Sequence, residues 1–237
     1  MLKIILKLIK YPHRFLIKLK FFNEKGLKNK FSTIYNTNYW DNKESISGPG
    51  SSLKNTKNLR QKLPIILKRY KIRSIVDAPC GDCNWIQSII KRSQIKYTGI
   101  DIVKECIDSN KLKFKDKNFN FKLMDITKNK IPSADLFICR DFIFHLSFKD
   151  THKFLQNLKK IKTKYILFSS HTKSKTEILL NKDIKSGDFR KINIFNTPYN
   201  FEEKYETVID DYCDGVKKYL ILFKKNDFIK FHKYMKT

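Results

Sequence analysis

Several carboxylates directly follow short apolar runs, and these acids have the clearest chemical potential in the sequence. Asp77 follows the run 74–76, and Asp101 follows the run 97–100, roughly 20 residues beyond a turn of small residues. Between the two acids, residues 85–90 have the apolar spacing of a helix. A nucleotide-binding βαβ unit has this same order of strand, turn, helix, strand and acid, and its second acid reaches ribose hydroxyls. The pattern therefore predicts a nucleoside ligand.

Other apolar runs that indicate strands also end in polar residues. These are 119–124 before Asp125, 134–139 before Arg140 and Asp141, and 165–168 before Ser169, Ser170 and His171. In an open parallel sheet, ligands bind just outside the carboxyl ends of the strands. We therefore expect these polar side chains to line one site.

Cys80 and Cys83 form a C-x-x-C pair within the first turn. A structural zinc site needs four ligands, usually from a second close pair, and the other three cysteines are isolated. A redox pair opens a helix after a strand, as this pair does. The neighbouring acids are nevertheless better explained by a nucleoside, so we predict no metal site. The odd total of five cysteines favours a reducing compartment over a disulfide framework.

The alternation of these segments predicts an α/β fold. Helices are expected at 85–90, 103–111 and 149–162, and an amphipathic helix capped by Asn55 or Thr56 should precede the first strand. The runs 205–211 and 218–223 bracket a turn and predict an antiparallel hairpin at the sheet edge. Residues 172–200 are too long for an ordinary connector, which indicates a functional loop.

Residues 1–22 form a basic, apolar segment without a run long enough to span a membrane. Lysines interrupt the apolar stretch and no small-residue cleavage site follows, so a signal peptide is not expected. Pro12 should divide the segment into two short helices. Two interpretations stay open: an interfacial helix on an anionic leaflet, or a helix that packs on the domain or a second subunit. We expect a helical extension over 1–30 and one domain over 31–237.

The formal charge of +27 raises the possibility of a nucleic-acid partner. Only seven of the 50 basic residues are arginine, however, and arginine dominates bidentate phosphate and base contacts. The richness in Asn, Ile and Phe is typical of an AT-biased genome. Drift toward lysine on solvated faces is therefore favoured over an anionic membrane surface, and nucleic acid is the least favoured partner.

Taken together, these motifs resemble those of class I S-adenosylmethionine-dependent methyltransferases. Asp77-Ala-Pro-Cys-Gly-Asp-Cys resembles their first motif, Gly99-Ile-Asp101 their second and Met124-Asp125-Ile126 their third. The resemblance covers about residues 35 to 224 and implies a Rossmann-like seven-stranded sheet, mostly parallel with a C-terminal antiparallel hairpin. Trp40 with Ser47–Ser51, and Gly187–Arg190 with Pro198, resemble a bacterial subfamily associated with surface-glycan gene neighbourhoods.

The resemblance implies S-adenosylmethionine as cofactor. Gly81 would let the backbone pass the methionine portion, Asp101 would accept both ribose hydroxyls, and Asp125 would accept from the adenine amino group. The full set of expected cofactor-binding residues is Trp40, Gly48, Gly50, Ser51, Asp77, Ala78, Pro79, Cys80, Gly81, Asp101, Ile102, Asp125, Ile126 and Arg140. The family commonly has glycine at the positions of Pro79 and Cys83; because the acids are retained, we interpret the change as a tolerated variant.

The expected reaction is methyl transfer to a small-molecule, glycan or lipid-linked acceptor through a hydroxyl, which requires a base. His145 and His171 are candidates because each follows a strand and histidine titrates near neutral pH. Asp141 is a third candidate, or the N-cap of its helix. Arg140 would hold an anionic group of the acceptor.

Two alternatives are kept open: an RNA methyltransferase, and a catalytically silent membrane- or RNA-binding module. Asn196-Thr-Pro-Tyr199 is similar to a base-methylating signature but lies in the wrong place, after the fifth strand rather than the fourth. The expected location is the cytoplasm; if residues 1–22 form an interfacial helix, the protein would be peripheral at the inner face of the membrane.

Overall fold

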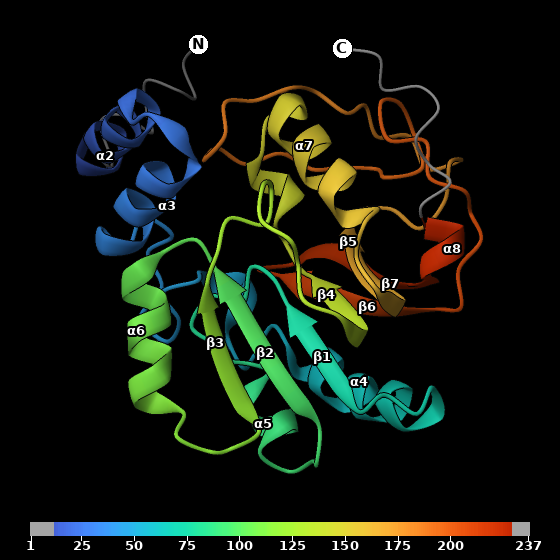
Figure 1. Ribbon diagram of the computed structural model, residues 1–237. Helices are drawn as coiled ribbons and strands as arrows, with labels where there is room; N and C mark the ends of the chain where they lie inside the picture. The colour runs from blue at the N-terminus through green and yellow to red at the C-terminus, as the bar shows by residue number, and fades with distance from the viewer. Residues whose placement is uncertain (1–11, 229–237) are drawn as a thin grey trace.

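The structure is a computed structural model, and it describes residues 12–228. Its centre is a seven-stranded sheet with the order β3-β2-β1-β4-β5-β7-β6 (Figure 1). The strands are β1 (Ser74–Asp77), β2 (Lys96–Asp101), β3 (Phe119–Leu123), β4 (Ala134–Cys139), β5 (Thr163–Ser170), β6 (Thr207–Cys213) and β7 (Val216–Lys224). β1 to β5 pair in parallel, whereas β7 runs antiparallel to β5 and β6. The predicted Rossmann-like sheet with a C-terminal hairpin is confirmed.

Side chains alternate along the strands, so the sheet has two buried faces. One face packs against α7 (Phe148–Leu158), α8 (Lys225–Phe228) and the irregular segment 192–201. The other face packs against α4 (Lys57–Arg69), α5 (Gln87–Ile90) and α6 (Lys104–Lys113). This arrangement leaves the carboxyl ends of the parallel strands available to form a site.

The predicted helices differ from the observed ones mainly at their ends. The helix expected at 149–162 ends at Leu158, and β5 already begins at Thr163. α4 buries the predicted apolar face, but it has no side-chain N-cap. Instead, the Thr56 hydroxyl donates to the carbonyl oxygen of Ser52, and the Asn55 amide donates to that of Pro49.

Helices α2 (Pro12–Asn23) and α3 (Gly26–Asn36) precede α4 along the chain, and they pack against each other (Figure 1). α2 begins at the predicted breakpoint, Pro12, while residues 1–11 of the expected extension lie outside the described residues. α3 crosses the expected boundary at residue 30, and the division into 1–30 and 31–237 stays a prediction. Among residues 12–228, no helix is both long and apolar enough to cross a bilayer.

The long segment 172–200 has no regular secondary structure but is held by side-chain amides. Asn193 donates to the carbonyl oxygens of Ser174 and Glu177, and Asn181 donates to those of Asn193 and Thr197. These side-chain bonds supply donors to backbone carbonyl oxygens that the hydrogen bonds of a helix or sheet would otherwise pair. The segment is thereby fixed beside the carboxyl end of β5.

Candidate functional site

The first turn is folded around Asp101, at the carboxyl end of β2. The Gly81 N–H donates to Asp101 Oδ2 at 3.1 Å, and the Val103 N–H donates to Oδ1 at 3.0 Å. Burial raises the pKa of Asp101, although these backbone donors oppose the rise. These two backbone bonds hold the carboxylate in one orientation, and its oxygens keep lone pairs that can accept from a ligand.

Asp77, at the end of β1, is a second buried carboxylate. The Tyr97 hydroxyl donates to its Oδ2 at 2.7 Å. Burial raises the pKa of Asp77 to about 7, against the lowering effects of Tyr97 and Arg140. Within residues 12–228, neither Asp77 nor Asp101 forms a salt bridge. Both acids therefore favour a ligand that brings positive charge or hydroxyl donors.

A third acid, Asp82, fastens a distant loop over the turn. Its carboxylate accepts from the Ser45 and Ser47 hydroxyls and from the Ile46 N–H, at 3.0–3.2 Å. Gly81 has a φ of +53°, and a Cβ there would lie 2.2 Å from the Ser47 hydroxyl oxygen. Glycine is therefore required at position 81 by both conformation and close approach.

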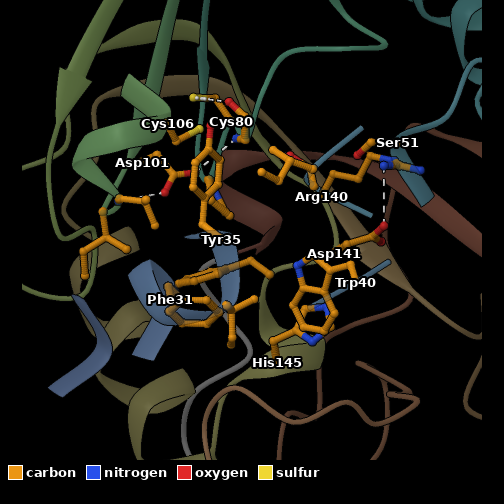
Figure 2. A pocket seen from close by; sticks show the side chains of 18 of the residues that line it. Phe31, Tyr35, Trp40, Ser51, Cys80, Asp101, Cys106, Arg140, Asp141 and His145 are labelled. Atoms are coloured by element: carbon orange, nitrogen blue, oxygen red, sulfur yellow. Dashed lines mark hydrogen bonds and ion pairs between the residues drawn. The ribbon is translucent and has the colours of Figure 1, made fainter. Parts of the chain in front are cut away.

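Asp77 and Asp101 line a central cavity between the carboxyl ends of the strands and α3. Figure 2 shows Asp101, Cys80 and Cys106 around one part of it and Arg140, Asp141, Trp40 and His145 around another. Phe31 and Tyr35 of α3 also line it. The expected ligand-binding residues found here are Trp40, Ser51, Asp77, Pro79, Cys80, Gly81, Asp101, Ile102 and Arg140. Ala78 is completely buried beneath the turn and does not line the cavity.

A smaller, mainly apolar side cavity adjoins the central one. The two share Phe31, Asp101 and Ile102 among their walls, and the side cavity adds Met124, Asp125 and Ile126. Asp125 Oδ1 accepts from the Thr127 N–H at 2.9 Å, which fixes the turn after β3. The predicted residues Asp125 and Ile126 are thus placed next to, and not within, the central cavity.

A third cavity of about 430 Å³, here called the outer cavity, opens on the other side of Trp40. It shares Trp40, Ser47, Asp141 and His145 with the central cavity. Its remaining lining includes Gly48, Gly50, His171, Phe189 and Lys218. The three base candidates are therefore brought together, and Gly48 and Gly50 face this cavity instead of the central one.

The two histidines of the outer cavity differ in their hydrogen bonds. His145 Nδ1 lies 2.9 Å from the carbonyl oxygen of Asp188, which only accepts, so Nδ1 carries the proton and Nε2 has a lone pair. His171 Nδ1 accepts from the Ile192 N–H at 3.2 Å, so the neutral ring carries its proton on Nε2. Burial lowers the pKa of His145, and lowers that of His171 to about 4. Only His145 offers a free basic nitrogen.

Asp141 belongs to a buried ionic network. Lys218 Nζ contacts both Asp141 and Asp211, and Arg140 donates from Nε to Asp211 at 2.9 Å. Burial alone would raise the pKa of Asp141, but Lys218 and Arg140 hold it well below its ordinary range. A carboxylate held ionised in this way is a poor proton acceptor.

Asp141 does not cap a helix, because Phe142 precedes the short 3₁₀ turn η2 (Ile143–His145) and no side chain caps it. Arg140 is buried, lines the central cavity, and donates to Asp211 and to the carbonyl oxygen of Gly50. Its expected contact with an anionic acceptor stays a prediction.

The C-x-x-C cysteines lie beside the central cavity with Cys106. The Asn110 amide donates to the carbonyl oxygen of Gly81 at 2.7 Å and lies 3.8–3.9 Å from the sulfurs of Cys80, Cys83 and Cys106. All three thiols are buried and free. Among residues 12–228, no group of three or more His, Cys, Asp or Glu is arranged to hold a metal ion.

Some site residues were missed by the sequence reasoning. Tyr35, Ser47 and Asp82 bound or organise the central cavity, while Phe189 and Lys218 line the outer cavity. Asp82 follows Gly81 in the recognised turn, so its position was a usable signal. Lys218 had none, because it is one lysine among many in a strand of a highly basic chain.

Comparisons with known proteins agree with this geometry. Residues 75–163, from β1 to the start of β5, match the family described as a methyltransferase domain. None of the curated proteins compared with the chain matches its sequence.

Three solved structures illustrate the similarity of fold. Magnesium protoporphyrin IX methyltransferase from Synechocystis PCC 6803, solved with bound S-adenosylmethionine, aligns with a TM-score of 0.55 at 11% identity, over 84% of this chain and 98% of that one. Human N-acetylserotonin methyltransferase, in complex with the same molecule, aligns with a TM-score of 0.53 at 14% identity, over 82% of this chain and 58% of that one. The methyltransferase domain of bacterial CtHen1 aligns with a TM-score of 0.53 at 14% identity, over 72% of this chain and 99% of that one.

The chain shares the fold of these methyltransferases, and residues 75–163 match the model of a methyltransferase domain. The comparisons support S-adenosylmethionine as the cofactor expected from the sequence.

Proposed function

We propose that the protein transfers the methyl group of S-adenosylmethionine to a hydroxyl of a small-molecule acceptor bound in the outer cavity. The observation that supports this most directly is the wall shared by the two cavities. Trp40, Ser47, Asp141 and His145 border both. A donor on one side and an acceptor on the other would meet beside a histidine with a free basic nitrogen.

The residues of the central and side cavities fit the cofactor chemically. Asp101, anchored by Gly81 and Val103, is suited to accept from two ribose hydroxyls. Asp77, buried without a cationic partner among residues 12–228, is suited to an ammonium group. The apolar side cavity with Asp125 suits adenine and its amino group. When bound, the cofactor supplies an electrophilic methyl group on a sulfonium.

The protein's own contribution to the chemistry is alignment and proton removal. Holding two reactants in line contributes up to about 7–11 kcal/mol in the best intramolecular cases. His145 takes the acceptor's hydroxyl proton on Nε2, while its Nδ1–H stays bonded to the Asp188 carbonyl oxygen. The lowered pKa of His145 keeps the imidazole neutral, and hence basic, at pH 7. General bases of this kind contribute about 10²–10⁴-fold to rate.

The outer cavity supports an acceptor with a ring. The rings of Trp40 and His145 lie with their centroids 4.6 Å apart and their planes tilted by 42°. The ring of Phe189 lies 5.6 Å from that of His145 and 5.9 Å from that of His171, centroid to centroid. Aromatic walls of this kind pack against flat or sugar-like rings. A glycan-precursor acceptor, as the sequence resemblance implies, fits this description and stays a prediction.

Isothermal titration calorimetry with S-adenosylmethionine tests the proposal. We expect Asp101→Ala to weaken binding by more than about tenfold, since charge-assisted hydrogen bonds contribute about 1.5–3 kcal/mol each. Asp108→Ala, an exposed acid on α6 paired with Lys104, is the matched control and should bind normally. Absence of binding by the wild-type chain would refute the enzyme assignment and leave a silent module on the same fold.

The acceptor class is tested by release of S-adenosylhomocysteine with panels of phenols and sugar alcohols. Turnover by the wild type and its loss in His145→Ala would support a hydroxyl acceptor. Turnover only with RNA, showing a steep dependence on salt, would replace it by the RNA alternative.

A further inference from the structure

Helix α2 turns basic side chains toward the protein, whereas an ordinary surface helix turns its polar side chains toward solvent. Its basic residues Arg14 and Lys18 face the protein: Arg14 Nη2 donates to the carbonyl oxygen of Tyr39 at 3.0 Å, and Lys18 Nζ contacts both carboxylate oxygens of Asp188 at 2.8 and 2.9 Å. Phe21 is completely buried and contacts the ring of Tyr39. These contacts fix the rotation of α2 on the domain.

The same rotation turns three large apolar side chains toward solvent. Phe15, Leu16 and Leu19 are 42%, 65% and 43% exposed. Their spacing places them on one face, because Leu19 lies four positions after Phe15 and three after Leu16, and residues three or four apart are neighbours on a helix. A helix at a water interface normally has the reverse arrangement, with its apolar stripe toward the core. This face, Phe15 with Leu16 and Leu19, therefore needs an apolar partner.

The charge of the segment identifies that partner. Residues 1–23 contain six lysines and arginines and no acid; the first acid of the chain is Glu24. Two of the six, Arg14 and Lys18, face the protein, whereas Lys20 is exposed beside the apolar face. A second copy of this chain would bring the same cations and another +27 of formal charge. A bilayer with anionic lipids offers both an apolar interior and a negative surface.

We propose that the Phe15–Leu16–Leu19 face of α2 inserts into the surface of an anionic membrane. Cations flanking an apolar face are the arrangement by which interfacial helices bind such surfaces. No span is required, and residues 12–228 contain none.

The position of α2 connects this surface to the outer cavity. Arg14, Asp188 and Phe189 all line that cavity, and Lys18 of α2 pairs with Asp188 (Figure 1 shows α2 at the periphery of the domain). Phe189, which follows Asp188 along the chain, is 51% exposed. Membrane attachment would place the acceptor cavity beside lipid, so the acceptor would be an amphiphilic or lipid-linked molecule. This last step rests on the proposed function; the attachment itself does not.

Vesicle flotation tests the attachment with the full-length chain. The probes are vesicles of phosphatidylcholine alone and of an equal mixture of phosphatidylcholine and phosphatidylglycerol. The test variant carries Phe15→Ser, Leu16→Ser and Leu19→Ser, which leave the net charge unchanged. Leu112→Ser on α6, at a position 75% exposed, is the matched control for loss of an exposed apolar residue.

We expect the wild type and the Leu112→Ser control to float with the mixed vesicles only, and the triple variant to bind them more than roughly tenfold less. An unchanged melting temperature and S-adenosylmethionine affinity in the triple variant would show that it is folded. Failure of the wild type to float, or equal flotation of the triple variant, would overturn the attachment. A wild-type dimer that the triple variant converts to a monomer would assign the face to self-association. None of these outcomes depends on methyl transfer, so the two proposals fail separately.

Discussion

Replacing Asp77 by Asn tests whether a buried charge has been retained for the ligand at the expense of stability. Asp77 is 2% exposed, and its pKa is raised from 3.8 to about 7. The principal cause is burial, and among residues 12–228 its one side-chain donor is the Tyr97 hydroxyl. Asparagine has nearly the same shape, and its amide oxygen can accept the same hydrogen bond.

The direction of the pH effect on stability follows from the pKa of Asp77 in the unfolded chain and in the folded protein. In the unfolded chain the carboxyl group ionises near 3.8, while in the folded protein it retains its proton up to about pH 7. Between these values folding takes up a proton, so the free energy of unfolding falls as pH rises. Raising the pKa by about three units lowers the free energy of unfolding at high pH by about 4 kcal/mol at most, since each pKa unit corresponds to about 1.4 kcal/mol. Water penetration and relaxation reduce such penalties, so we expect about 2–4 kcal/mol.

Urea unfolding of both proteins without ligand, at about pH 5 and about pH 8, measures this difference. Asp77→Asn should be more stable than the wild type at the higher pH, and the gap should shrink at the lower pH. In the same variant, affinity for S-adenosylmethionine should fall at least about tenfold at the higher pH, since a charged partner for the ammonium group is lost. A stability gap that does not change with pH would refute the reasoning.

Three further predictions concern both cavities. His145→Ala should lower kcat by about 10²–10⁴-fold and leave S-adenosylmethionine affinity intact, whereas the control His152→Ala on α7 should change neither. The wild-type rate should fall with decreasing pH only below pH 6.5, because burial lowers the pKa of His145. Lys218→Met should destabilise the protein by up to about 3–5 kcal/mol in urea unfolding, because it leaves Arg140 as the remaining cation of the network for two carboxylates, Asp141 and the buried Asp211. Lys217→Met, at the adjacent exposed position, should unfold like the wild type. Gly81→Ala should abolish detectable cofactor binding in calorimetry, and retained affinity would contradict the close approach deduced there.

The fold could be predicted from the sequence because its signals are local. Buried parallel strands appear as short apolar runs, and the polar residue after each run marks the strand end. Asp77 and Asp101 were placed correctly at the ends of β1 and β2 for this reason. Strand and helix ends were less accurate, as at β5, because hydrogen bonding of the last residues depends on neighbouring elements.

The geometry of the site required the three-dimensional structure. No feature of the sequence ranks His145 above His171, because the choice depends on one carbonyl oxygen and one N–H from the irregular segment 172–200. Asp141 was a reasonable base or cap until Lys218, 77 residues away along the chain, was found beside it. Long-range contacts of this kind leave no periodic pattern in the sequence.

The central and outer cavities differ in how they are assembled, and under the proposed function this difference has a consequence for specificity. The central cavity is formed largely by loops that follow neighbouring strands, so its acids recur at readable positions after apolar runs. The outer cavity takes Arg14 from α2, Phe189 from the segment 172–200 and Lys218 from β7. Changes in α2 or in 172–200 would therefore alter acceptor choice without disturbing Asp77 or Asp101. For the same reason, a membrane-bound α2 would select acceptors by where they are presented as well as by shape, a form of specificity that the methyltransferase fold alone does not determine.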